Sequence, residues 1–83
     1  MLNPARKLRF TWGGEKTALY WRLVEASNSG GLRAGDQGRM ASSARRKDIN
    51  RLAAAGLVER WCRQTWRATP AGLEVLAALV REG

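Results

Sequence analysis

The 83-residue sequence contains no histidine and only one cysteine, Cys62. An intramolecular disulfide, a Cys/His zinc site and a histidine general base are therefore excluded. No glycine pattern has the form of a phosphate-binding loop, and no run approaches the ~18 apolar residues of a membrane span. The seven acidic residues are scattered, so a two-metal nuclease is the one catalytic class left open. We expect a non-enzymatic, cytoplasmic protein with no cofactor, metal or membrane partner.

Positive charge dominates the sequence. Lys and Arg total 15 against 7 Asp and Glu, which gives a net charge of +8. Arginine outnumbers lysine twelve to three. A planar guanidinium can form two parallel hydrogen bonds to a phosphate or a guanine edge, so this bias favours nucleic-acid contact, although a GC-rich genome explains the same bias. Apolar residues make up 45% of the chain and include four tryptophans, too many for a disordered basic tail. The composition predicts one folded basic domain over residues 1–83 with an anionic partner.

The first half of the chain is expected to hold one strand and one helix. Alternating apolar residues within 1–12 predict a basic N-terminal strand or arm, and helical spacing predicts a first helix over 15–27. The glycine-rich segment 28–41 follows. We expect it to be mostly loop, with a short helix capped by Asp36 as an alternative within it.

The second half has clearer boundaries. A serine N-cap and Gly56 delimit a helix over 42–55. Two short strands over 57–69 are close enough to form a hairpin, although their turn lacks an Asn-Gly or Asp-Gly pair. Thr69 and Pro70 then predict the start of a closing helix over 70–82.

Residues 51–76, RLAAAGLVERWCRQTWRATPAGLEVL, resemble winged helix-turn-helix regulators of the MarR and PadR sort. The similar elements are Leu52, the run Gly56-Leu57-Val58-Glu59, and Thr69 with Gly72. The resemblance extends over 42–80 and implies a small α+β winged helix, a three-helix core with a two- or three-stranded β-hairpin wing. Those regulators place a clear helix before the recognition helix, whereas this chain has the glycine-rich segment 28–41 there.

The resemblance also implies that the helix over 42–55 enters the DNA major groove as a recognition helix. At roughly 100° per residue, with its apolar side turned inward, its outer side carries candidate DNA contacts. Asn50 is suited to pair with adenine, Arg46 to fork onto guanine, and Ser43 to bind a base or a phosphate. Lys47 and Arg51 are suited to grip phosphate. Arg45 lies near the apolar side, so either the helix begins after it or its stem covers the core with the head free.

The hairpin over 57–69 adds further cations. Arg63 lies at the expected wing tip and is the first candidate there, with Arg60, Gln64 and Arg67 behind it. A solvated helix face is the alternative explanation for the charges over 42–51. The clustering of both groups of cations in sequence favours a shared nucleic-acid surface.

The four tryptophans and Cys62 are interpreted mainly as core residues. Trp12, Trp21, Trp61 and Trp66 could stack on single-stranded nucleic acid, but large apolar side chains are valuable in a core this small. Trp61 and Trp66 are expected to meet across or beside the hairpin. Cys62 is expected to be a small interior residue.

The closing helix carries two apolar lines. One is expected to face the core and comprises Leu73, Leu76, Ala77 and Val80. The other leaves two alternatives, a homodimer interface or a deeply wrapped helix, and comprises Val75, Ala78 and Leu79.

Three functions follow from these patterns. The first is sequence-specific binding of double-stranded DNA by a small bacterial, phage or mobile-element transcriptional regulator. The second keeps the fold but makes it a protein-interaction module, such as a phage-encoded inhibitor or adaptor acting on a nucleic-acid-handling complex. The third and weakest is binding of RNA or single strands through exposed tryptophans.

Overall fold

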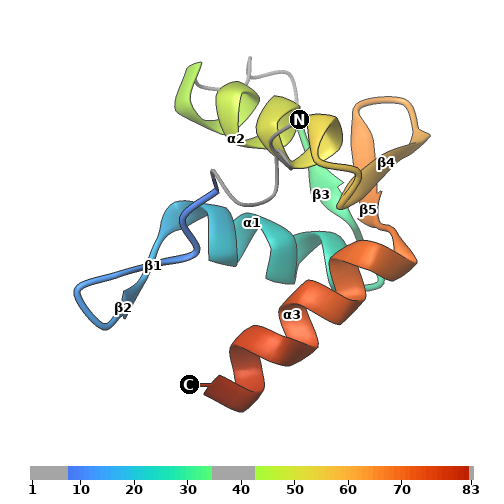
Figure 1. Ribbon diagram of the computed structural model, residues 1–83. Coiled ribbons are helices and arrows are strands. Elements are labelled where there is room, and N and C mark those ends of the chain that lie inside the picture. Colours follow the sequence, from blue (N-terminus) through green and yellow to red (C-terminus); the bar gives the residue numbers. More distant parts are fainter. Residues whose placement is uncertain (1–7, 35–42, 83) are drawn as a thin grey trace.

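The computed structural model describes residues 8–34 and 43–82, which form a small α+β domain with three helices and two antiparallel sheets. Figure 1 shows α1 lying between α2 and α3, with the larger sheet standing at one end of the helices. The elements in chain order are β1 (Thr11–Trp12), β2 (Glu15–Lys16), α1 (Ala18–Ser27), β3 (Leu32–Arg33), α2 (Ser43–Ala54), β4 (Val58–Cys62), β5 (Thr65–Ala68) and α3 (Pro70–Glu82).

Residues 11–16 form a small hairpin, so the described end of the expected strand pairs with the residues that follow it. β1 pairs with β2 across Gly13 and Gly14, whose positive φ angles of 59° and 89° suit glycine. Because Glu15 and Lys16 are engaged in this pairing, α1 begins at Ala18 and not at residue 15. The expected helix over 15–27 is therefore shorter at its N-terminal end.

The larger sheet has the strand order β3-β5-β4, all antiparallel. Its third strand, β3, comes from the segment 28–41 that the sequence predicted as loop. Leu32 of β3 is fully buried and pairs with Trp66 of β5, so one apolar residue within a glycine-rich stretch fills the core and fixes the strand. The short helix considered near Asp36 lies outside the described residues.

α2 ends at Ala54, one residue before the predicted end, and Gly56, predicted as its stop, has a φ of 75° in the left-handed region. The backbone N–H of Gly56 donates to the carbonyl of Ala53 (3.0 Å), and that of Leu57 donates to the carbonyl of Leu52 (2.9 Å). This pair of bonds is a Schellman cap, and it leads the chain directly from α2 into β4.

α3 begins at Pro70 with Thr69 as its cap, which confirms the predicted boundary. The hydroxyl of Thr69 accepts a hydrogen bond from the backbone N–H of Gly72 (3.1 Å) and donates to the carbonyl of Gly56 (2.6 Å). A Cβ atom on Gly72 would lie 2.0 Å from the Leu57 carbonyl oxygen. Glycine at this position therefore lets the first turn of α3 pack directly on the α2–β4 connection.

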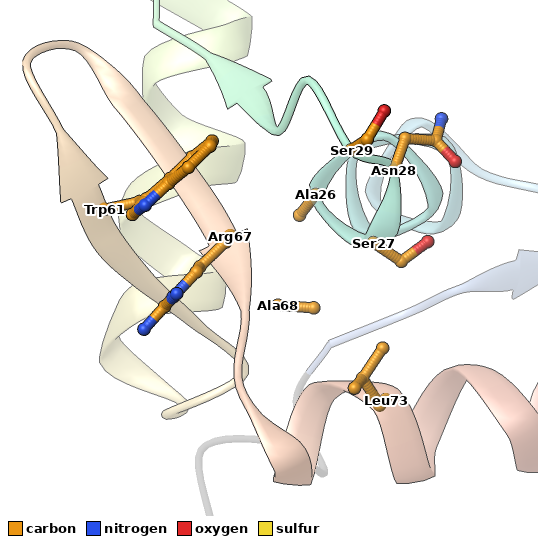
Figure 2. Close-up of a pocket in the computed structure, with 8 residues that line it drawn as sticks. All are labelled: Ala26, Ser27, Asn28, Ser29, Trp61, Arg67, Ala68 and Leu73. Atoms are coloured by element: carbon orange, nitrogen blue, oxygen red, sulfur yellow. The ribbon is translucent and has the colours of Figure 1, made fainter.

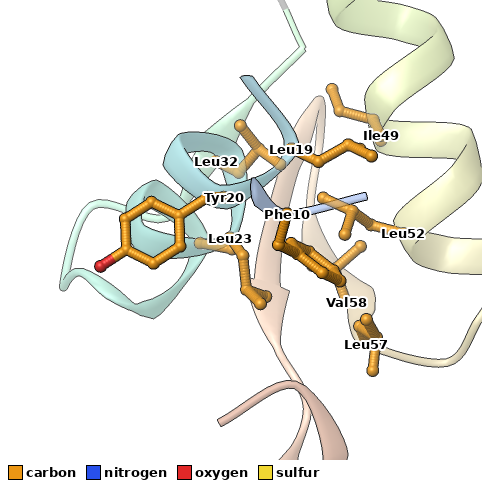
Figure 3. Close-up of a cluster of buried hydrophobic side chains, with 10 residues drawn as sticks. Phe10, Leu19, Tyr20, Leu23, Leu32, Ile49, Leu52, Leu57 and Val58 are labelled. Carbon is orange, nitrogen blue, oxygen red and sulfur yellow. The ribbon is translucent and has the colours of Figure 1, made fainter. Parts of the chain in front are cut away.

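The core is built from aliphatic side chains of α1, β3, α2 and the start of β4, together with Phe10 and Tyr20 (Figure 3). Leu23, Leu32 and Leu52 are its largest fully buried members. The buried hydrophobic residues are Phe10, Leu19, Tyr20, Leu23, Ala26, Leu32, Ile49, Leu52, Leu57 and Val58.

The prediction that the tryptophans form the core is wrong for three of the four. Trp12, Trp21 and Trp61 are 64%, 56% and 51% exposed, and only Trp66 packs partly against the core. Trp66 is paired with Arg60 in the hairpin register, so the preceding and following residues point to the other side of the ribbon. In the part of the chain that the structure describes, the ring pair is Tyr20 with Trp21, not Trp61 with Trp66.

Two further expectations about burial are corrected. Cys62 is exposed, because β4 has by then run past the core toward the hairpin turn. On α3 the predicted core line is right for Leu76 but wrong for Leu73, Ala77 and Val80, of which Leu73 and Val80 are 49% and 60% exposed. Val75 and Leu79 of the other line also pack against the core.

Candidate nucleic-acid interface

α2 is anchored on one side and open on the other. Ile49 and Leu52 are 3% and 0% exposed and fix the helix on the core. The helical wheel therefore turns the other side to solvent. All five predicted DNA-contact residues of this helix are exposed, namely Ser43, Arg46, Lys47, Asn50 and Arg51.

The acidic side chains between α1 and α2 are used to hold the two helices together. Asp48 of α2 lies 3.6 Å from Arg22 Nε of α1. Glu25 of α1 pairs with Arg45 of α2, and Arg45 Nε also donates to the Arg33 carbonyl of β3 (2.6 Å). Both carboxylates are therefore paired with arginines on the side of α2 that faces α1.

Neither arrangement expected for Arg45, a helix that begins after it or a stem over the core with a free head, is found. α2 already begins at Ser43, and the Arg45 head is not free. Because its partners come from α1 and β3, Arg45 ties the exposed helix to two other elements. Arg45 therefore helps to hold α2 against α1 and β3.

One face of the β4–β5 hairpin looks toward α2. Trp66 lines a hollow of about 250 Å³ together with Ala34, Ile49 and the two DNA-contact candidates Arg46 and Asn50. Arg60 is the cross-strand partner of Trp66, and cross-strand partners lie on the same face of a sheet. Arg60 is therefore on the hairpin face that is turned to α2.

The hairpin turn lies at Arg63 and Gln64, both exposed. Gln64 has a φ of 57°, a left-handed conformation that is uncommon outside glycine. The Ala34 N–H donates to the Gln64 carbonyl (2.8 Å), so the chain after β3 supports the hairpin up to its turn. Figure 1 shows this turn reaching toward the same side of the molecule as α2.

Arg67 is separated from the other candidates. It pairs with Glu59 on β4, with 3.0 Å between Arg67 Nε and Glu59 Oε1. Thr65 to Ala68 alternate along β5, so Arg67 and Trp66 point to opposite faces. Figure 2 shows Arg67 beside Trp61 on the face that borders the end of α1 and the start of α3. The structure therefore brings eight of the nine predicted residues to the α2 side or the hairpin turn and excludes Arg67.

A residue that the sequence did not single out joins this surface. Exposed Arg9 lines a hollow of about 380 Å³ with Thr17, Asp48 and Arg51, at the side of α2 next to the N-terminal segment. Its guanidinium also stacks over the Trp12 ring, 4.7 Å from the centroid. The sequence marked the N-terminal segment as basic, but only the packing of that segment beside α2 places Arg9 next to Arg51.

No family model matches the chain, and no curated protein or solved structure matches it either. Among residues 8–34 and 43–82, no three histidine, cysteine or acidic side chains gather where they could hold a metal ion. No helix within the same residues is long and apolar enough to cross a membrane.

Proposed function

We propose that this protein is a small winged-helix domain that binds double-stranded DNA sequence-specifically, as a prokaryotic or phage transcriptional regulator in the cytoplasm. In this proposal α2 is the recognition helix in the major groove, and the β4–β5 hairpin is the wing. The order of elements, α1, β3, α2, β4, β5 and α3, supports this proposal. In it β3 pairs with β5 as the third strand of the hairpin sheet.

The observation that carries the proposal is the unbalanced positive charge on one side of the domain. Arg46, Lys47 and Arg51 project from α2, while the nearby carboxylates of Glu25 and Asp48 pair with inward arginines. Further exposed cations border this helix on two sides, Arg60 and Arg63 on the hairpin and Arg9 at the N-terminal segment. A helix flanked by cations suits a groove whose two rims are phosphate backbones.

The positions divide the work between reading bases and holding phosphates. Arg46 and Asn50 lie in the middle of α2, at the hollow facing Trp66, and these side-chain types make bidentate contacts to guanine and adenine. Lys47 and Arg51 lie on the same helix as phosphate contacts, and Arg63 reaches the backbone from the hairpin turn. Ser43, at the N-terminus of α2, is placed for a base or a phosphate.

The test is a titration of the protein with a 30-base-pair duplex, a single strand and an RNA of the same sequence. About five to six cations contacting phosphate predict a log-log salt slope of roughly −5. Duplex affinity should then fall about 10³-fold between 50 and 200 mM salt. Duplex binding that is absent at 50 mM salt, or equal at both salt concentrations, would reject the proposal.

A second candidate function, a protein-interaction module, is favoured by a different surface. A groove of about 230 Å³ lies between the hairpin, the end of α1 and the start of α3, and half-exposed Trp61 and Leu73 line it (Figure 2). Large apolar side chains left open in this way are common in protein interfaces. If this groove and not the α2 side is the functional surface, the wild-type protein should show no salt-sensitive duplex binding.

Single-strand binding has weaker support. The exposed tryptophans Trp12, Trp21 and Trp61 come from three different elements and do not line the α2 side of the hairpin. A stacking platform requires aromatic rings along one basic groove. Strong quenching of tryptophan fluorescence by the single strand, with none by the duplex, would favour this third function.

A further inference from the structure

α2 has a hollow on each of its two flanks. The hollow on the first flank faces the β4–β5 hairpin, and Arg46 and Trp66 are among its lining residues. The hollow on the second flank is lined by Arg9, Asp48 and Arg51 and by the start of α1. At about 100° per residue, Arg46 and Asp48 are about 200° apart around α2, so the two hollows lie on opposite flanks. Figure 1 shows β1 and β2 at the start of α1 and the β4–β5 hairpin beyond its other end.

The second hollow carries an excess of positive charge. Arg9 and Arg51 are both exposed, and neither takes part in an ion pair within residues 8–34 and 43–82. Among the described lining residues the one carboxylate is that of Asp48, which lies 3.6 Å from Arg22 Nε of α1. Two guanidiniums therefore face one carboxylate that already has another cation beside it. This balance of charge suits the hollow to an anion.

Arg9 is held in place at both its backbone and its side chain. The Thr17 hydroxyl donates to the Arg9 carbonyl, and the Thr17 N–H donates to the carbonyl of buried Phe10 (3.0 Å). The Arg9 guanidinium lies over the Trp12 ring, 4.7 Å from the centroid. Attraction to an aromatic ring uses none of the five N–H donors of a guanidinium. The ring therefore positions the Arg9 head and leaves its donors for an oxygen ligand.

We propose that Arg9 and Arg51 together hold one phosphate of the DNA backbone, and that Trp12 is the residue that positions Arg9. This role rests on the proposed function, in which the hairpin contacts the backbone on the first flank of α2. A helix in the major groove has a phosphate backbone on each side, so cations on the second flank reach the backbone that the hairpin does not. A guanidinium can donate two parallel hydrogen bonds to phosphate oxygens. Arg9 and Trp12 precede residues 42–80, so the resemblance to winged-helix regulators does not account for this contact.

A double-mutant cycle tests whether the two arginines share one phosphate. Arg9→Gln, Arg51→Gln and the double variant are titrated with a labelled random 30-base-pair duplex at 50 mM salt by fluorescence anisotropy. Each single variant should lose at least about fivefold in affinity, because a charge-assisted hydrogen bond to phosphate is removed. The double variant should lose at least about threefold less than the product of the two single losses, because both substitutions act on the same phosphate. In the control cycle, Arg51→Gln with Arg60→Gln, the losses should multiply, because these residues serve opposite flanks of α2.

Trp12 is tested through its dependence on Arg9. Trp12→Ala should weaken duplex binding about threefold, and Trp12→Phe should restore most of that loss, because a phenyl ring also attracts a cation. In the Arg9→Gln background, Trp12→Ala should have no further effect. Trp21→Ala is the matched control, since it removes a tryptophan that is 56% exposed and whose ring contact is with Tyr20. It should leave duplex affinity unchanged, with circular dichroism confirming that every variant is folded.

Two results would overturn this phosphate contact while leaving duplex binding intact. The first is single losses that multiply in the Arg9–Arg51 cycle as they do in the control cycle. The second is an equal loss from Trp12→Ala with and without Arg9, which would give Trp12 a role of its own. A wild-type protein that does not bind the duplex at 50 mM salt would instead reject the proposed function, and this contact with it.

Discussion

Arg60 and Arg67 provide a matched test of whether the hairpin is a DNA-binding wing. Both are exposed arginines of the same hairpin, and replacing either with glutamine lowers the net charge by one from +8. They differ in the face they occupy, since Arg60 is paired with Trp66 on the α2 side and Arg67 is paired with Glu59 on the other. Any effect of total charge is therefore the same for both variants.

The expected magnitudes follow from counterion release. Each phosphate-contacting cation contributes about −0.9 to the slope of log affinity against log salt. Arg60→Gln should make the slope shallower by about 0.9, so the loss of affinity between 50 and 200 mM salt shrinks by about 3.5-fold. Arg67→Gln should leave the slope nearly unchanged, because its charge faces away from the DNA and is already offset by Glu59.

The measurement is fluorescence anisotropy of a labelled random 30-base-pair duplex at four salt concentrations for the wild type and both variants. The double variant Glu59→Gln with Arg67→Gln keeps the wild-type net charge and should also keep the wild-type slope. Equal slope changes from Arg60→Gln and Arg67→Gln would refute the assignment of DNA contact to one face of the hairpin. A larger change from Arg67→Gln would assign that contact to the Arg67 face instead.

Three further predictions concern single residues. Asn50→Ala should relax base preference at a duplex selected from a random pool while changing affinity for random duplex little, as measured by competition. Equal losses on both duplexes would remove Asn50 from base recognition. Gly72→Ala should lower the free energy of unfolding by at least about 2 kcal/mol, because its Cβ would meet the Leu57 carbonyl oxygen at 2.0 Å. A melting temperature within 3 °C of the wild type, on a scale of about 4–8 °C per kcal/mol, would contradict that packing. Gln64→Gly should stabilise the protein by about 0.5–1 kcal/mol in urea unfolding, because relief of the left-handed φ of 57°, worth roughly 1–2 kcal/mol, exceeds the entropic cost of glycine. A destabilised variant would show that the Gln64 side chain has contacts that outweigh the strain.

The sequence by itself determined the elements whose boundaries depend on near neighbours. Gly56 ends α2 and Thr69 begins α3 because each acts on hydrogen bonds within a few residues. The outward positions of α2, including Lys47 and Asn50, followed from helical geometry once Ile49 was placed inside. These features required no knowledge of distant segments.

Only the tertiary structure decided which of two similar surfaces is buried and which is open. Both apolar lines of α3 satisfy a helical period, and tertiary packing placed Leu76 of one line and Val75 and Leu79 of the other against the core. Leu32 became a strand residue because β5 offered it a partner, and Arg67 was turned away from α2 by the pairing of β5 with β4. Local periodicity indicates that a helix or hairpin has two distinct sides. Which of the two sides is buried depends on contacts between segments far apart in the chain.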